Sequence, residues 1–216
     1  METRDLIRAL SADSGGPRFS LGRSWTLAVL LAIMVAAAIF FAFIHPRHDV
    51  AAAAGTVRFL FKFVVAGLLA ATALAALVML SRPEPGGRGR MASLAAAPLA
   101  LLAAVVLELT VVPSADWGSR LIGSNSLYCL LFIPLMGIGP LALFVAALRH
   151  GAPSRPGLAG AVAGLAAGGI AATLYAAHCI DDSPLFVATW YTLAIAILSG
   201  AGALAGRAFA RWLCAG

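Results

Sequence analysis

The 216-residue sequence is poor in charge and lacks the short motifs that mark enzymes. Charged residues make up 11% of the chain, whereas a soluble domain carries about 25%. There is no His-Glu-x-x-His motif, no Gly-rich phosphate loop with its lysine, and no Ser, His and Asp set with suggestive placement. These absences argue against an enzyme, and we expect no cofactor.

Apolar sequence fills the chain instead, because 62% of the residues are hydrophobic and most lie in six runs of 20 to 22 residues. About 20 residues of helix cross the roughly 30 Å hydrocarbon core of a bilayer. A helix also satisfies its own backbone hydrogen bonds in lipid. The sequence therefore predicts an all-α polytopic membrane protein, a bundle of six transmembrane helices with short loops. The runs are Trp25–Ile44, Phe59–Leu80, Met91–Val112, Leu127–Leu148, Leu158–Ala177 and Leu185–Ala205.

Basic residues are divided unevenly between the two sides of such a bundle. With the N-terminus in the cytoplasm, eleven of the 15 Lys and Arg residues lie on the cytoplasmic side and four on the other. The positive-inside rule then places both termini in the cytoplasm. The net charge of +6 therefore reflects membrane topology rather than nucleic-acid binding. The partner that we expect for the apolar helices is membrane lipid. We divide the chain into a cytoplasmic tail (1–24), a transmembrane domain (25–206) and a second cytoplasmic tail (207–216).

Small residues and prolines mark the fourth, fifth and sixth helices. The fifth has a row of glycines that includes Gly160 and Gly164, and the sixth has Gly202 and Gly206 at the same four-residue spacing. Small residues let helix backbones approach closely in lipid, which favours packing within the chain over a dimer seam. In the fourth helix, the segment 134–140 contains two prolines and two glycines, and it should kink or locally break the helix.

The helix interiors give little support to transport, because no charged residue lies in the middle of a run. Lys62 and Glu108 lie near the outer ends of the second and third helices, from which their side chains can snorkel to the interface. Transporters usually keep ionisable groups deeper in the membrane. A small metal or solute permease and a structural subunit of a larger membrane complex remain as alternatives.

The N-terminal tail opens with the pattern of a short amphipathic helix. A threonine can cap it, an aspartate suits its first turn, and three apolar residues share one face. Two or three turns are unstable alone in water, and a Gly-Gly-Pro tether follows at 15–17. The segment is typical of a peptide that folds as it docks into a partner's groove, or of a helix lying on lipid or on the bundle. Its residues are Thr3, Asp5, Leu6, Ile7, Arg8 and Leu10.

Two cysteines mark the outer side. Cys129 begins the fourth helix and Cys179 ends the fifth, so the topology puts both at the same face of the membrane. They can form a redox-responsive disulfide. They can also hold a soft metal ion together with His178 and the carboxylates of Asp181 and Asp182. A third reading is a pair of small, inert, buried side chains.

These features together resemble the NrsF-type transmembrane anti-sigma factors of bacteria. The resemblance extends over nearly the whole chain, and the Cys-x-x-Asp-Ser-Pro turn is its most specific part. It rests on the six spans, Thr3-x-Asp5-Leu6-Ile7-x-x-Leu10, Cys129 and the turn His178-Cys179-x-x-Asp182-Ser183-Pro184-x-Phe186.

The resemblance implies an anti-sigma factor. Members of the family hold an extracytoplasmic-function sigma factor at the inner membrane and release it under heavy-metal or oxidative stress. The paired cysteines of the family match Cys129 and Cys179 and are implicated in sensing. We therefore expect the sigma factor to bind the six tail residues named above, and the stress to be sensed at Cys129, Cys179, His178 and Asp182, which are also the candidate metal ligands.

Overall fold

A computed structural model describes residues 21–82 and 88–215, without the side chains of Leu21, Arg88 and 209–215. This part of the chain contains helices and no strand, and six of its segments are long and apolar enough to cross a membrane. The spans are α2 (Leu21–Ile39) with η1 (Phe40–Ile44), α4 (Val57–Leu80), α5 (Arg88–Ser93) with α6 (Ala96–Val111), α8 (Ser126–Leu148), α9 (Pro156–Tyr175), and α10 (Pro184–Phe186) with η3 (Val187–Tyr191) and α11 (Thr192–Ala215).

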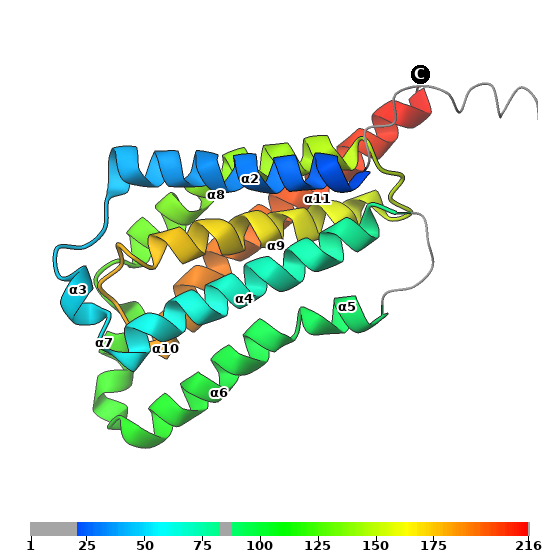
Figure 1. Ribbon diagram of the computed structural model, residues 1–216. Helices are drawn as coiled ribbons and strands as arrows, with labels where there is room; N and C mark the ends of the chain where they lie inside the picture. Colours follow the sequence, from blue (N-terminus) through cyan, green and yellow to red (C-terminus); the bar gives the residue numbers. More distant parts are fainter. Residues whose placement is uncertain (1–20, 83–87, 216) are drawn as a thin grey trace, which may run out of the picture.

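The predicted all-α bundle of six spans is therefore confirmed. The short elements α3 (Val50–Ala53), η2 (Ser114–Asp116) and α7 (Trp117–Ile122) lie in two of the connections at one end of the bundle (Figure 1). We call this the cysteine end, because the connection between α9 and α10 contains Cys179. The opposite end, where the described part of the chain begins and ends, is the terminal end.

Helix α9 is the centre of the bundle, and α6 lies at its edge. Of the membrane-spanning stretches, 67% of the Pro156–Tyr175 stretch is buried but only 11% of the Gly89–Val111 stretch. Helix α9 packs against α11, α4 and α8, whereas α6 runs beside α4 (Figure 1) and makes few contacts with α10 and η3. Most of the surface of α6 therefore faces lipid.

The glycines of α9 and α11 bring these two helices into backbone contact. A Cβ atom on Gly160 would overlap the carbonyl oxygen of Gly202, and one on Gly164 would overlap that of Leu198. A Cβ on Gly206 would likewise overlap the carbonyl oxygen of Pro156. The predicted packing of the glycine row within the chain is confirmed.

The local break predicted around Pro134 and Pro140 is absent, since α8 continues as one helix from Ser126 to Leu148. The glycines between the prolines serve packing instead. A Cβ on Gly137 would overlap the Leu198 side chain, and one on Gly139 would lie 2.6 Å from Cγ1 of Val35. Pro is tolerated in membrane helices where the neighbouring turns keep their hydrogen bonds. The irregular turns of the bundle are the π-helical segments η1 and η3.

Two cores follow one another along the bundle. The terminal-half core consists largely of alanines from α2, α4 and α9, with Trp25 and Phe144 as its main aromatic side chains. The cysteine-half core contains both cysteines, with tyrosine, phenylalanine, methionine and isoleucine side chains. Both π-helical segments contribute to the cysteine-half core, through Phe40 and Tyr191 among others.

Candidate functional site

The candidate site is built around residues 176–183, which connect α9 to α10 and which we call the cysteine turn. Cys179 lies within this turn, and Cys129 lies in the first turn of α8. Both are free thiols with no exposed surface, and they belong to one core. A hydrogen bond with the Cys129 thiol and the nearby charge of Lys62 lower the pKa of Cys179, although burial opposes the shift. The fold thus buries the two predicted cysteines in one core.

A buried ion-pair network holds the turn against α4. The Lys62 ammonium is 2.6 Å from a carboxylate oxygen of Asp182 and donates a hydrogen bond of 2.8 Å to the carbonyl oxygen of Cys179. Arg47 reaches the same carboxylate from the connection after η1, at 3.1 Å. Arg47 also pairs with the exposed Asp49 at 2.6 Å and holds the pKa of that carboxyl below its ordinary value. A charge buried at this depth requires such partners.

A second buried charge attaches α6 to the start of α10. Glu108 accepts hydrogen bonds from the Ser183 hydroxyl at 2.7 Å and from the Leu185 backbone amide at 3.1 Å. Arg120 and Arg58 approach its other oxygen at 3.3 Å and 3.6 Å. Because α6 buries little apolar surface, these polar bonds supply its main connection to the turn.

The prediction that Lys62 and Glu108 snorkel to the interface is therefore wrong. Lys62 is 1% exposed and Glu108 is 4% exposed, so both side chains face the interior of the bundle. Sequence position gives the depth of a residue in the membrane but not the side of the helix on which it lies. Hydrogen-bond and ionic partners in and around the cysteine turn compensate both charges.

The loop between α7 and α8 covers the turn from a third direction. One carboxylate oxygen of Asp181 accepts hydrogen bonds from the backbone amides of Ser124 and Asn125, at 3.1 Å and 2.8 Å. The preceding Gly123 makes this approach possible, because it has a φ of 58° and a Cβ there would lie 2.5 Å from the Phe186 ring. The turn and the loop are thus joined at the N-terminal end of α8, one turn from Cys129.

His178 and Asp182 have partners other than the two sulfurs. Nδ1 of His178 lies 2.8 Å from the carbonyl oxygen of His45, a residue with a left-handed φ of 63°. Asp182 faces Lys62, as described above. Among the residues that the structure describes, no three His, Cys, Asp or Glu side chains are grouped so that they could hold a metal ion. The four predicted ligands do not come together as one set, and the two thiols remain as a pair.

Two tyrosines complete the site, and the sequence did not point to them. Tyr175 ends α9 and Tyr191 ends η3, with their ring centroids 6.0 Å apart. Both tyrosines are buried in the same core as Cys129 and Cys179. Tyrosine near a span end is typical of the aromatic belt at the membrane interface, so sequence alone offers no sign that these hydroxyls face inward.

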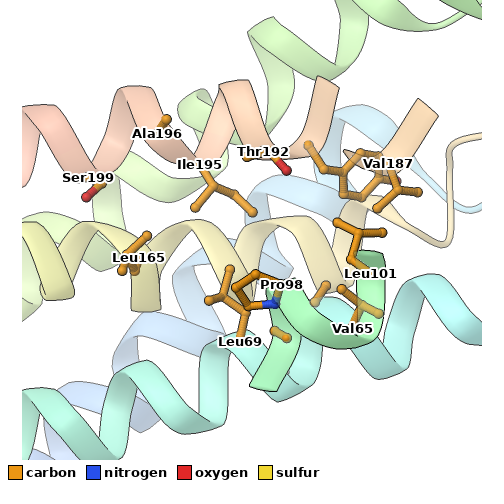
Figure 2. A pocket seen from close by; sticks show the side chains of 13 residues that line it. Val65, Leu69, Pro98, Leu101, Leu165, Val187, Thr192, Ile195, Ala196 and Ser199 are labelled. Atoms are coloured by element: carbon orange, nitrogen blue, oxygen red, sulfur yellow. The ribbon is translucent and has the colours of Figure 1, made fainter. Parts of the chain in front are cut away.

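An apolar pocket of about 300 Å³ lies beside the site, between α4, α6, α9 and the start of α11 (Figure 2). Val65 and Leu69 come from α4, and Pro98 and Leu101 come from α6. Tyr191 also lines the pocket and belongs to the same core as the two thiols. The sigma-binding residues predicted in the tail (3–10) lie outside the described residues.

Comparison with known proteins gives the chain its relatives. A family model described as negative regulator of sigma F (NrsF) matches residues 10–212. The protein named anti-sigma-F factor NrsF of Caulobacter vibrioides is 36% identical over 216 residues, which covers 98% of this chain and 100% of the relative. The protein named "Probable anti-sigma-F factor NrsF" of Azospira oryzae is 30% identical over 213 residues, with the same coverage. No solved structure matches the chain.

Proposed function

Because the chain belongs to the NrsF family of negative regulators of sigma F, we propose that it is an anti-sigma factor that holds an extracytoplasmic-function sigma factor at the bacterial inner membrane. The observation that carries the proposal is the full-length similarity to relatives with that name. The six membrane-spanning helices supply the anchor. An even number of spans puts both ends of the chain on one side, which the distribution of basic residues assigns to the cytoplasm.

The tail is the proposed binding element. Leu6, Ile7 and Leu10 form the apolar face that enters a groove on the sigma factor, with Asp5 and Arg8 at its edges and Thr3 as the cap. Occupying that groove competes with the sigma factor's use of core polymerase.

The cysteine pair is the proposed sensor of oxidative or metal stress. A peroxide would convert the pair to a disulfide: two S–H bonds break, one S–S bond forms, and the peroxide takes both protons and both electrons and is reduced to water. A soft metal ion would instead replace the two thiol protons. Either event changes the distance between the sulfurs of Cys129 and Cys179, and therefore moves the cysteine turn relative to α8.

A reporter of sigma-dependent transcription in the native bacterium tests both parts. Replacing Leu6 and Leu10 with Asp should give expression without stress, because each buried apolar side chain contributes on the order of 1–3 kcal/mol and the pair's loss weakens binding well over tenfold. The matched control, Ala9→Asp with Ala12→Asp, adds the same charge off the apolar face and should still repress. Repression by the Leu6 and Leu10 variant at normal membrane levels would rule out the tail as the binding element.

The same reporter tests the sensor. Replacing Cys129 and Cys179 together with Ser should abolish the response to hydrogen peroxide or a soft metal ion, and each single replacement should have about the same effect, because the two thiols act as a unit. Cys214→Ser is the control, since it alters a thiol in the C-terminal tail. Normal induction in the double variant would mean that the two cysteines only fill space in the core.

A further inference from the structure

A groove lies between α4 and α6 at the cysteine end, apart from the pocket beside the cysteine-half core. Its volume is about 410 Å³, within the range of roughly 300–1,000 Å³ that is typical of ligand pockets. Phe61 of α4 and three alanines of α6 line it, the alanines being Ala100, Ala103 and Ala104. Because alanine carries only a methyl group, this stretch of α6 leaves open space beside α4.

Arg58 is the exposed cation of this groove. It lines the groove and its side chain is 46% exposed. Arg58 is the second residue of α4, a helix of 24 residues. Such a helix is about 36 Å long and therefore exceeds the roughly 30 Å hydrocarbon core of a bilayer. The first turn of α4 thus reaches the level of the lipid headgroups, where phosphates lie.

The charges around Arg58 do not balance. Arg58 and Arg120 both approach one carboxylate oxygen of Glu108, at 3.6 Å and 3.3 Å. The other oxygen of Glu108 accepts hydrogen bonds from Ser183 and from the backbone amide of Leu185. Within this cluster of described residues, one buried carboxylate therefore serves two guanidinium groups. The distance from Arg58 to Glu108 is longer than a hydrogen bond, so the Arg58 donors can serve another acceptor.

We propose that the groove binds an anionic phospholipid from the leaflet at the cysteine end. Its phosphate pairs with Arg58, and one of its acyl chains lies between α4 and α6. The guanidinium fork matches two phosphate oxygens at once, and the apolar walls suit a hydrocarbon chain. The excess positive charge of the cluster selects a headgroup with a net negative charge over a zwitterionic one.

The bound lipid would give α6 contacts that it lacks within the protein. Helix α6 belongs to the least buried of the six spans, and its polar bonds to the cysteine turn run through Glu108. An acyl chain in the groove touches α4 and α6 together and lies beside Glu108, which also lines the groove. The lipid would therefore stabilise the position of α6 on the bundle. This role is independent of any binding to a sigma factor.

Photo-crosslinking of the purified full-length protein tests the proposal. The protein is placed in phosphatidylcholine nanodiscs with a trace of phosphatidylglycerol that carries a photoreactive diazirine in one acyl chain. Peptide mapping by mass spectrometry should find the label on residues 57–61 and 100–111. An excess of unlabelled phosphatidylglycerol should displace the probe, whereas the same excess of phosphatidylcholine should not. Arg58→Met should reduce the labelling roughly tenfold, because it removes a charge-assisted contact to the phosphate.

Matched variants at the other end of the same span control for general effects of the substitutions. Arg90→Met removes an exposed arginine of α5 and should leave the labelling unchanged, and Arg58→Lys keeps the charge and should retain most of it. Ala103→Phe places a ring in the groove and should displace the acyl chain, whereas Ala92→Phe alters an exposed alanine of α5 and should not. Thermal unfolding shows that each variant is folded before it is labelled.

Equal labelling of Arg58→Met and Arg90→Met would overturn the proposal, because it would mean that the label reports lipid in general contact with the bundle. Equal displacement of the probe by the two unlabelled lipids would overturn it as well. Absence of label from both segments in a protein that elutes as a dimer would assign the groove to a second copy and would also contradict it. None of these measurements involves a sigma factor or a cysteine, so their outcome is separate from that of the proposed anti-sigma function.

Discussion

The two halves of the bundle are held together in different ways. In the terminal half, alanines and glycines allow α9 and α11 to touch through their backbones, and the core contains few polar atoms. In the cysteine half, aromatic rings and thiols fill the core, two spans contain π-helical turns, and buried charges join the connections to one another. The first half therefore depends on backbone contact between small residues, whereas the second half depends on side-chain packing and on partners for its buried charges.

The comparison rests on the backbone contact between α9 and α11, so its most severe test is to add a methyl group at that contact. Gly164→Ala should lower the free energy of unfolding by about 3 kcal/mol or more, because the new Cβ overlaps the Leu198 carbonyl oxygen and forces the helices apart. Gly200→Ala on the same helix pair is the control, since a Cβ there meets nothing within 4 Å. Thermal or denaturant unfolding in detergent measures both. Similar losses of unfolding free energy in the two variants would contradict close packing of α9 against α11.

The second prediction concerns the charges that hold the cysteine half. Lys62→Met should cost about 3 kcal/mol of unfolding free energy, because it removes one partner of a buried ion pair and leaves the Asp182 carboxylate with Arg47 alone. Arg58→Met, one turn earlier on α4, removes a half-exposed cation 3.6 Å from Glu108 and should cost less than about 1 kcal/mol. Equal effects would mean that burial does not distinguish the two cations.

The smallest effect is expected at the rim of the same network. Asp49 and Asp182 both pair with Arg47, but the side chains are 56% and 23% exposed. Asp49→Asn should leave the unfolding temperature at pH 7 unchanged, whereas Asp182→Asn should lower it. The pKa of Asp49 is lowered by Arg47, so whatever stability it contributes is present above the ordinary carboxyl pKa and is lost as the pH falls through the lowered one. Matched pH titrations of unfolding in the two variants check this ordering.

The sequence predicted the spans closely and the site only in part. The predicted run Phe59–Leu80 corresponds to α4 (Val57–Leu80), and Leu127–Leu148 corresponds to α8 (Ser126–Leu148). Length and hydropathy determine such segments because the bilayer imposes them. The pairing of Cys129 with Cys179 was within reach as well, since both lie at the same end of neighbouring helices.

The remaining parts of the site depend on helix rotation, which hydropathy does not report. Nearly every face of these helices is apolar, so no amphipathic pattern shows that Lys62 and Glu108 turn inward. The π-helical turn that carries Tyr191 adds a local rotation without any proline or glycine within the segment Val187–Tyr191. The prolines of α8 drew attention to a helix that remains continuous, while the π-helical turns η1 and η3 contain neither proline nor glycine.

The cysteine turn is attached to several parts of the bundle independently. Four separate connections leave it: to α4 through Lys62, to α6 through Glu108, to the start of α8 through Ser124 and Asn125, and to the connection after η1 through Arg47 and His45. A displacement of the turn would therefore act on four parts of the bundle at once, and its effect would not depend on a single helix. Loss of a single connection should therefore leave the turn attached to three other parts of the bundle.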